Sequence, residues 1–268
     1  MIERTDDTGF GGIKVIQSKG SGYGVDAVLL AAFTAGETGA HGLQKNDAAD
    51  RQKVRAPFLR IADLGTGCGV IAFILHHKLS RGSGAAGGCG TVKMTGYDIN
   101  PAAIDRAVRA CEVNGLTDDI DFICCDIRDI RDIGQDFDAV VTNPPYFRRT
   151  PDEPGAADPD ERYIARHETT ADIGDFARIS AAMLKDGGSL FIIHRPDRLA
   201  DIISEMRAAG IEPKEMQFVV PSAGKAANMV LIRGVKGAGF ELRMLPEIAV
   251  HSEDGGYTKE ILKYYERA

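Results

Sequence analysis

The 268-residue sequence contains no tryptophan, only five cysteines and no long apolar run. No stretch approaches the roughly 18 to 20 apolar residues that a membrane-spanning helix needs. The first residues lack the apolar core of a signal peptide. The cysteines are odd in number and show no CxxC spacing, which predicts neither a disulfide framework nor a zinc site. These absences predict a cytoplasmic protein without a membrane or metal partner.

Positive charge is also scarce. The chain has 32 Lys and Arg against 39 Asp and Glu, a formal net charge of −7, and its pI is near 5.4. This balance argues against a broadly basic surface, because phosphate binding draws on clustered Lys and Arg. Local basic clusters remain at 51–55, at Arg148 with Arg149, and at Arg162 with Arg166.

Strand-like and helix-like segments alternate from Leu59 onward. We expect strands at 59–64, 92–98, 120–125, 139–142, 188–194, 215–220, 228–233 and 240–245, and helices at 70–79, 101–114, 173–184, 196–209 and 258–265. Such alternation predicts an α/β fold with a mostly parallel sheet and helices on both faces. The strands that follow one another at the end predict an antiparallel edge.

The chain is predicted to be one domain with an N-terminal extension. The extension, 1–58, is expected to hold a short strand near residues 13–17, a helix at 27–33 capped by Asp26, and a flexible loop at 35–57. Residues 59–268 form the predicted main domain. Gly-, Pro- and charge-rich loops are expected at 81–90 and 147–171.

A glycine-rich turn follows the strand at 59–64, and ligands in open α/β sheets bind at the carboxyl ends of strands. The turn is Gly65-Thr66-Gly67-Cys68-Gly69, and Asp63 lies two residues before its first glycine. Glycines allow a close approach to a ligand, and the amides that open the next helix favour an anionic group. The dinucleotide pattern is G-x-G-x-x-G. The G-x-G-x-G spacing found here instead resembles motif I of class I methyltransferases, which favours S-adenosylmethionine over a nicotinamide cofactor.

Two further acids end neighbouring strands. Asp98 ends the strand at 92–98, where a carboxylate can accept hydrogen bonds from both ribose hydroxyls of either cofactor; alternatively it caps the helix at 101–114. Asp126 follows the third strand, and the resemblance implies a position near the adenine amino group of the cofactor. Its alternative is a solvated acidic loop. Ile99 and Ile127, which follow the two acids, and Asn143 complete the predicted cofactor site. Cys124 and Cys125 are interpreted as small packing residues.

The tetrapeptide Asn143-Pro144-Pro145-Tyr146 follows the strand at 139–142. With motif I, it resembles the S-adenosylmethionine-dependent amino-methyltransferases, which methylate a planar nitrogen such as adenine N6 or a glutamine amide. Such a nitrogen is a poor nucleophile that bears two N–H donors. The Asn143 side-chain oxygen and the Pro144 carbonyl can accept those hydrogens, on a backbone stiffened by two prolines. Tyr146 and Phe147 can stack on a planar acceptor.

The segments 11–17, 22–30 and 165–168 resemble bacterial tRNA(Val) adenine-N6-methyltransferases. The resemblance implies a Rossmann-like fold with a mostly parallel seven-stranded sheet, and methylation of the adenosine at position 37 of tRNA, beside the anticodon. The tRNA contacts are then expected at Tyr146, Phe147, Arg148, Arg149, Arg166 and His167. Three alternatives stay open: a glutamine methyltransferase acting on release factors, a ribosomal RNA methyltransferase, and a binding protein without catalysis.

Overall fold

The computed structural model describes residues 3–18, 22–38, 43, 58–81, 91–131, 136–148, 167–168 and 170–267. Its helices, including two single turns of 3-10 helix (η), are α1 (Val25–Ala35), α2 (Val70–Arg81), α3 (Pro101–Asn114), η2 (Ile127–Asp129), α5 (Ile173–Met183), η3 (Pro196–Arg198), α6 (Leu199–Ala208) and α7 (Lys259–Tyr264). Its strands are β1 (Glu3–Asp7), β2 (Lys14–Ser18), β3 (Phe58–Leu64), β4 (Thr91–Asp98), β5 (Ile120–Cys124), β6 (Phe137–Thr142), β7 (Phe147–Arg148), β8 (His167–Glu168), β9 (Leu184–His194), β10 (Ile211–Ser222), β11 (Met229–Lys236), β12 (Arg243–Met244) and β13 (Ile248–His251).

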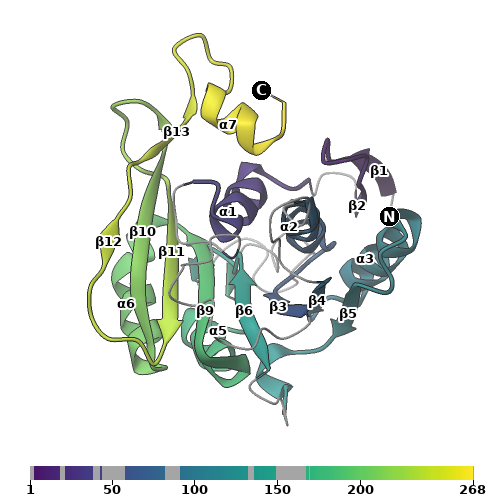
Figure 1. Ribbon diagram of the computed structural model, residues 1–268, viewed down its shortest axis with the longest axis horizontal. Helices are drawn as coiled ribbons and strands as arrows, with labels where there is room; N and C mark the ends of the chain where they lie inside the picture. Colours follow the sequence, from purple (N-terminus) through teal and green to yellow (C-terminus); the bar gives the residue numbers. More distant parts are fainter. Residues whose placement is uncertain are drawn as a thin grey trace.

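One nine-stranded sheet organises the chain (Figure 1). Its order is β12-β10-β11-β9-β6-β3-β4-β5, and β13 also pairs with β10. The pairs from β5 to β9 are parallel, whereas β11 runs antiparallel to both of its neighbours. Because β11 runs in the opposite sense, β10 points the same way as the central strands. The predicted α/β fold with an antiparallel edge is confirmed; the predicted count of seven strands is exceeded because β12 and β13 both pair with β10.

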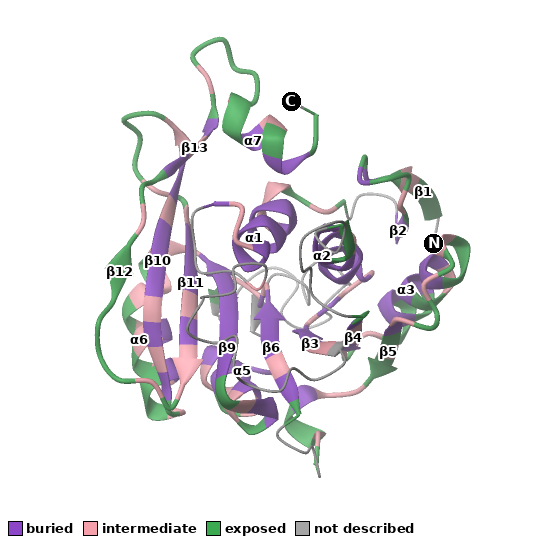
Figure 2. Cartoon of the chain, in the orientation of Figure 1, coloured by how far each residue is buried: buried purple, intermediate pink, exposed green. Residues whose placement is uncertain are grey.

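The core has two halves because side chains alternate along each strand. In β9, Phe191 and Ile193 belong to a cluster with α1 and α2, whereas Leu190 and Ile192 belong to a second cluster with α5 and α6. Helices therefore cover both faces of the sheet. Burial is most continuous along α1, α2, β6 and β9 at the centre of the molecule (Figure 2).

The N-terminal segment packs onto the main sheet layer through α3. β1 and β2 pair antiparallel. The side chain of Asn114, the last residue of α3, accepts from the Lys14 amide at 2.9 Å and donates to the Lys14 carbonyl at 2.7 Å. These paired hydrogen bonds hold β2 beside α3. The predicted boundary between an extension at 1–58 and a main domain at 59–268 stays a prediction.

Several predicted elements change in the structure. The helix at 196–209 is a 3-10 turn followed by α6, and the strand at 240–245 shortens to β12. Strands β1 and β13 were not predicted. The predicted loop at 147–171 is wrong at its ends, because β7 and β8 pair in parallel there. Residues 149–166, most of 35–57 and nearly all of 81–90 lie outside the described residues.

Candidate active site

The glycine turn joins β3 to α2 in a conformation that requires glycine. Gly65, Gly67 and Gly69 have φ of +72°, +56° and +81°, the left-handed region that other residues rarely adopt. A Cβ on Gly69 would also lie 2.6 Å from the Phe122 ring. The backbone amide of Gly65 donates to the Tyr97 carbonyl on β4 at 2.8 Å. The turn is therefore attached to the end of the neighbouring strand.

Asp63 is fully buried beneath this turn. The Thr66 hydroxyl donates to Asp63 Oδ2 at 2.7 Å, while Oδ1 is buried without a hydrogen-bond partner. Burial raises the pKa of Asp63 to about 7, against the hydrogen bond from Thr66, which lowers it. The absence of a donor at Oδ1 favours the neutral carboxyl, whose proton then lies on this oxygen.

Asp98 ties the end of β4 to the glycine turn. Its Oδ2 accepts from the Gly67 amide and its Oδ1 from the Asn100 amide, both at 2.8 Å. Asp98 does not cap α3; the Asn100 side chain does, accepting from the amides of Ala102 and Ala103. Asp98 therefore joins the end of β4 to both the glycine turn and the start of α3.

Asp126 follows β5, and its carboxylate already accepts hydrogen bonds from Arg128. It caps η2, and its Oδ2 accepts from the Arg128 guanidinium at 2.6 Å. This hydrogen bond holds the pKa of Asp126 below its ordinary value. Ile127 is buried beside it, whereas Ile99 is 37% exposed next to Asp98.

Two cysteines near the site, Cys68 and Cys125, are not activated thiols. Burial raises the pKa of Cys68 in the glycine turn to about 11 and also raises the pKa of Cys125. Cys124 was interpreted as a packing residue, but it is exposed. Thiolate chemistry is therefore not supported at Cys68 and Cys125.

Strand pairing brings the Asn-Pro-Pro-Tyr segment next to the glycine turn. Thr142, the last residue of β6, is in register with Leu64, the last residue of β3, and its hydroxyl donates to the Leu64 carbonyl at 2.8 Å. Asn143 and Gly65 are the next residues along these two adjacent parallel strands. The two motifs that were predicted to work together thus begin side by side.

Asn143 and Tyr146 share one partner, Asp26. Asn143 Nδ2 donates to Asp26 Oδ2 at 3.0 Å, and the Tyr146 hydroxyl donates to the same oxygen at 3.1 Å. Asn143 Oδ1 is buried and has no hydrogen-bond partner. Pro144 is buried between the two residues. The segment therefore carries one anchored amide group and one free acceptor oxygen.

Asp26 does not cap α1 as predicted. The N-cap is Gly24, and Asp26 lies in the first helical turn with its side chain directed to the tetrapeptide. The sequence offered one signal for this: an acid within the N-terminal segment that resembles the methyltransferase family.

His194, at the end of β9, is a second site neighbour that the sequence did not single out. It is fully buried, and its ring meets that of Tyr146 edge-on, with centroids 5.2 Å apart. Its Nδ1 accepts from the Arg195 amide at 2.8 Å, which places the ring proton on Nε2. Burial, followed by the Arg198 charge, lowers the pKa of His194 to about 4.

The predicted substrate contacts are only partly described. Phe147 is 41% exposed, and the Arg195 guanidinium lies 5.0 Å from its ring centroid. The backbones of Arg148 and His167 belong to the paired strands β7 and β8. Arg149 and Arg166 lie outside the described residues.

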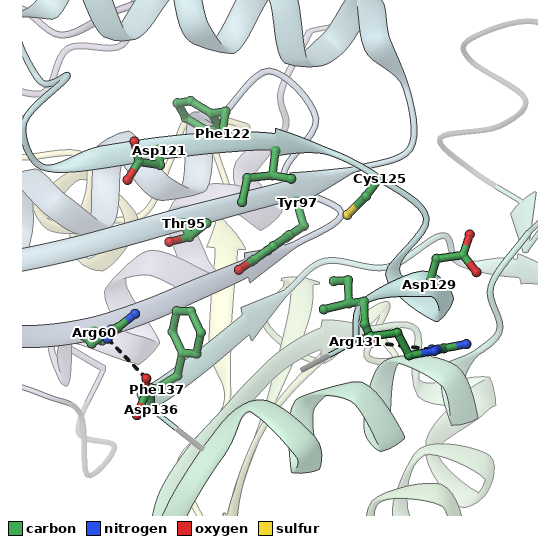
Figure 3. Close-up of a pocket in the computed structure, with 12 residues that line it drawn as sticks. Arg60, Thr95, Tyr97, Asp121, Phe122, Cys125, Asp129, Arg131, Asp136 and Phe137 are labelled. Atoms are coloured by element: carbon green, nitrogen blue, oxygen red, sulfur yellow. Dashed lines mark hydrogen bonds and ion pairs between the residues drawn. The ribbon is translucent and has the colours of Figure 1, made fainter. Parts of the chain in front are cut away.

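A cavity of about 740 Å³ lies beside this site, on the sheet face that bears α5 (Figure 3). Between β5 and β6 the described residues contain only the single turn η2. Its lining includes Arg60, Thr95, Tyr97, Phe122, Arg131 and Phe137, and none of the predicted cofactor residues. The predicted site is therefore separate from this cavity.

The described residues contain neither a membrane-spanning helix nor a metal-ligand cluster. No helix there is long and apolar enough to cross a bilayer. No group of three or more His, Cys, Asp or Glu in those residues is arranged to hold a metal ion.

Comparison with known proteins agrees with the fold and the motifs. A methyltransferase domain family matches residues 57–223. A tRNA1(Val) (adenine(37)-N6)-methyltransferase of Actinobacillus pleuropneumoniae serotype 7 is 24% identical over 204 residues, 75% of this chain and 78% of the relative. The enzyme of that name from Bacteroides fragilis strain YCH46 is 23% identical over 249 residues, 90% of each chain.

A solved structure shares the architecture. The crystal structure of a predicted O-methyltransferase from Agrobacterium tumefaciens has a TM-score of 0.63, at 21% identity, covering 91% of this chain and 97% of that chain. At this identity the likeness concerns the fold, which is that of the class I methyltransferases. Fold, motifs and family match together show that the chain belongs to the methyltransferase domain family and is a methyltransferase, as its sequence predicted.

Proposed function

We propose that this protein is an S-adenosylmethionine-dependent methyltransferase that methylates adenine N6 in the anticodon loop of tRNA, at position 37. The observation that carries the proposal is the free, buried Asn143 Oδ1 beside the glycine turn. An acceptor oxygen held there without a donor suits an exocyclic amino group, which brings two N–H donors.

The cofactor would be held by the glycine turn and the strand-end acids. The amides of the turn suit a carboxylate. Asp98 suits ribose hydroxyls by its position, because it ends β4 directly against the glycine turn, where a strand-end carboxylate meets the ribose in open α/β sheets. The fit of Asp126 is weaker, because Arg128 already occupies its Oδ2. S-adenosylmethionine supplies a methyl group already activated on a sulfonium sulfur.

The residues of the tetrapeptide would prepare the nucleophile. An adenine amino nitrogen has its lone pair delocalised into the ring. Hydrogen bonds from its two N–H groups to Asn143 Oδ1 and the Pro144 carbonyl would favour a pyramidal nitrogen with a localised lone pair. These acceptors are preorganised, since Pro144 and Pro145 fix the backbone and Asn143 is anchored through its Nδ2.

The identity of the acceptor rests on the relatives. Both named relatives are tRNA adenine-N6 methyltransferases, and together they align with most of this chain. Bases of an anticodon loop are unpaired, so one can be turned out and stacked on an aromatic side chain at low cost. Phe147, exposed next to the tetrapeptide, offers such a surface together with Tyr146.

Methyl transfer from radiolabelled S-adenosylmethionine tests the proposal directly. The purified protein is incubated separately with unmodified tRNA(Val) transcript, total tRNA, ribosomal RNA and purified release factor. Label in the transcript, recovered as N6-methyladenosine at position 37, is the expected result. Label in release factor alone would assign a glutamine methyltransferase, and label in ribosomal RNA alone a ribosomal RNA enzyme. No transfer to any acceptor would contradict the proposal.

A further inference from the structure

We propose that Asp26 is a positioning residue for methyl transfer, which orients the side-chain amide of Asn143 so that its oxygen faces the acceptor. The inference rests on the proposed function and names a residue outside the Asn-Pro-Pro-Tyr motif. Asp26 belongs to α1, 117 residues away in the chain, and reaches the motif through a single carboxylate oxygen.

The orientation follows from hydrogen-bond chemistry. A side-chain amide has a donating and an accepting end of nearly equal shape. A carboxylate only accepts, so Asp26 selects the NH2 end of Asn143 at 3.0 Å. The oxygen must then point away from Asp26, and it is this oxygen that is buried without a partner. Reversal of the amide would place NH2 against the amino group of the substrate, donor against donor.

The same carboxylate oxygen fixes Tyr146. The Tyr146 hydroxyl donates to Asp26 Oδ2 at 3.1 Å, and burial together with the Asp26 charge raises the pKa of Tyr146 well above its ordinary value. The phenol therefore stays protonated and remains a donor. Asn143 and Tyr146, the two residues of the tetrapeptide whose side chains can rotate, thus both hydrogen-bond to the same carboxylate oxygen of α1.

The backbone before Asp26 leaves room for the carboxylate. A Cβ on Gly24 would lie 2.5 Å from Asp26 Oδ1. Gly24 has φ of −101°, so the glycine is not required by backbone conformation. Gly24→Ala would therefore displace the Asp26 carboxylate but keep its negative charge. The variant tests whether the position of the carboxylate matters for methyl transfer.

The alternative role for Asp26 is structural. An acid in the first turn of a helix interacts favourably with the helix dipole, and its loss would reduce stability without a specific effect on chemistry. The two roles differ in what they predict for the rate of methyl transfer once the cofactor is bound.

The experiment compares Asp26→Ala, Asp26→Asn and Gly24→Ala with two controls. Gly239→Ala places a Cβ where no atom lies within 4 Å. Asp172→Asn alters the first turn of another helix, α5, where Asp172 is the N-cap. Calorimetry gives the dissociation constant for S-adenosylmethionine, and single-turnover transfer to the acceptor that wild type methylates gives the rate of the bound complex.

We expect Asp26→Ala to lower the single-turnover rate by about 10²-fold, the scale of losing one preorganised polar contact. Asp26→Asn and Gly24→Ala should give losses of roughly tenfold, since each keeps part of the interaction. Cofactor affinity should stay within about threefold, and both controls should match wild type. A large loss of cofactor affinity with an unchanged rate at saturation would overturn the proposal.

A double-mutant cycle with Asn143 tests whether Asp26 acts through it. In the Asn143→Ala background, Asp26→Ala should lower the single-turnover rate by less than about threefold. The reason is that the effects of two residues that act as a unit are not additive. If Asp26→Ala still costs its full factor in that background, Asp26 does not work by orienting Asn143.

Nuclear magnetic resonance reports on the side-chain amide of Asn143 and requires no methyl-accepting substrate. The chain has five asparagines, so protein labelled with 15N-asparagine gives few side-chain signals, and Asn143→Ala identifies the relevant pair. Asp26→Ala should shift this pair and speed its proton exchange, while the amide of Asn114, bound to the Lys14 carbonyl, stays unchanged. An unmoved Asn143 signal would refute the role of Asp26. A wild-type protein that methylates nothing would instead refute the proposed function.

Discussion

The carboxylate of Asp98 accepts the backbone amide of Gly67 at 2.8 Å, so the acid that ends β4 also holds the glycine turn that follows β3. The same carboxylate accepts the Asn100 amide at the start of α3. One side chain thus fixes the turn and lies in the proposed cofactor site, so its replacement should affect both the turn and cofactor binding.

We therefore expect Asp98→Ala to weaken S-adenosylmethionine binding strongly in calorimetry, by at least about 1.5–3 kcal/mol, the usual worth of hydrogen bonds to a charged group. Asn100→Ala is the matched control. It removes the α3 cap, which should cost about 1 kcal/mol of stability, and should leave cofactor affinity nearly unchanged. Tight NADH binding without a response to S-adenosylmethionine would sink the cofactor assignment.

Asn143→Ala should separate chemistry from cofactor binding. The variant loses the free acceptor oxygen but none of the glycine turn. Turnover should fall by roughly 10²-fold or more, while the dissociation constant for S-adenosylmethionine stays close to that of wild type.

Tyr146→Ala should slow methylation through lost stacking, worth about 1–3 kcal/mol. Tyr146→Phe is its control, because it keeps the ring and removes only the hydroxyl that donates to Asp26. Wild-type turnover in Asn143→Ala and Tyr146→Ala alike would reduce the motif to a proline-rich loop.

Asp63 should make the protein less stable as pH rises from about 4 to about 7. In this range the unfolded carboxyl, with its ordinary pKa of 3.8, has lost its proton, whereas the folded one keeps it up to about 7. The folded state then binds more protons, so the free energy of unfolding falls by up to about 1.4 kcal/mol per pH unit. Urea unfolding across pH 4–8 measures the free energy of unfolding of wild type and of Asp63→Asn. As pH rises, the variant should become more stable relative to wild type. A pH-independent difference would show that Asp63 is ionised when folded.

The contribution of His194 to stability should depend on pH in the opposite sense, rising as pH rises. Its pKa in the folded protein is about 4 against an ordinary 6.5, so between these values the unfolded state binds the extra proton. Stability due to the neutral buried ring is present above pH 6.5 and is lost as pH falls toward 4. Relative to His194→Gln, wild type should lose stability on acidification through this window. The imidazole C–H signals of His194 should meanwhile show no titration near pH 6.5.

The elements with strong local signals were predictable from the sequence. α3 spans Pro101–Asn114 as expected, because proline opens it, Asn100 caps it and Gly115, with φ of +64°, ends it. β3 and the glycine turn are equally well marked. In contrast, β13 is a four-residue strand, and its pairing with β10 depends on a register that no local pattern encodes.

The site was predictable where its residues follow strands directly. Strand-end position alone puts Asp98, Gly65 and Asn143 at one edge of the sheet. The contact of Asp26 with Asn143 was not predictable, since it joins residues 117 apart and its acid also fits a helix cap. His194 was missed for a similar reason: a buried histidine at a strand end resembles any core residue until its neighbour Tyr146 is placed.

RNA binding should depend on salt despite the acidic net charge of −7. If Arg148 and Arg149, which follow the tetrapeptide, contact tRNA phosphates, reversing both charges should weaken tRNA binding and reduce the slope of log K against log salt by about 2, one for each lost phosphate contact. The affinity for S-adenosylmethionine should not change. The matched control reverses Arg207 and Lys214, which lie at the end of α6 and the start of β10, the sheet edge opposite the motifs. Filter binding of unmodified tRNA at several salt concentrations gives both slopes. Equal slopes in the two double variants would mean that the basic pair after the tetrapeptide does not contact the RNA.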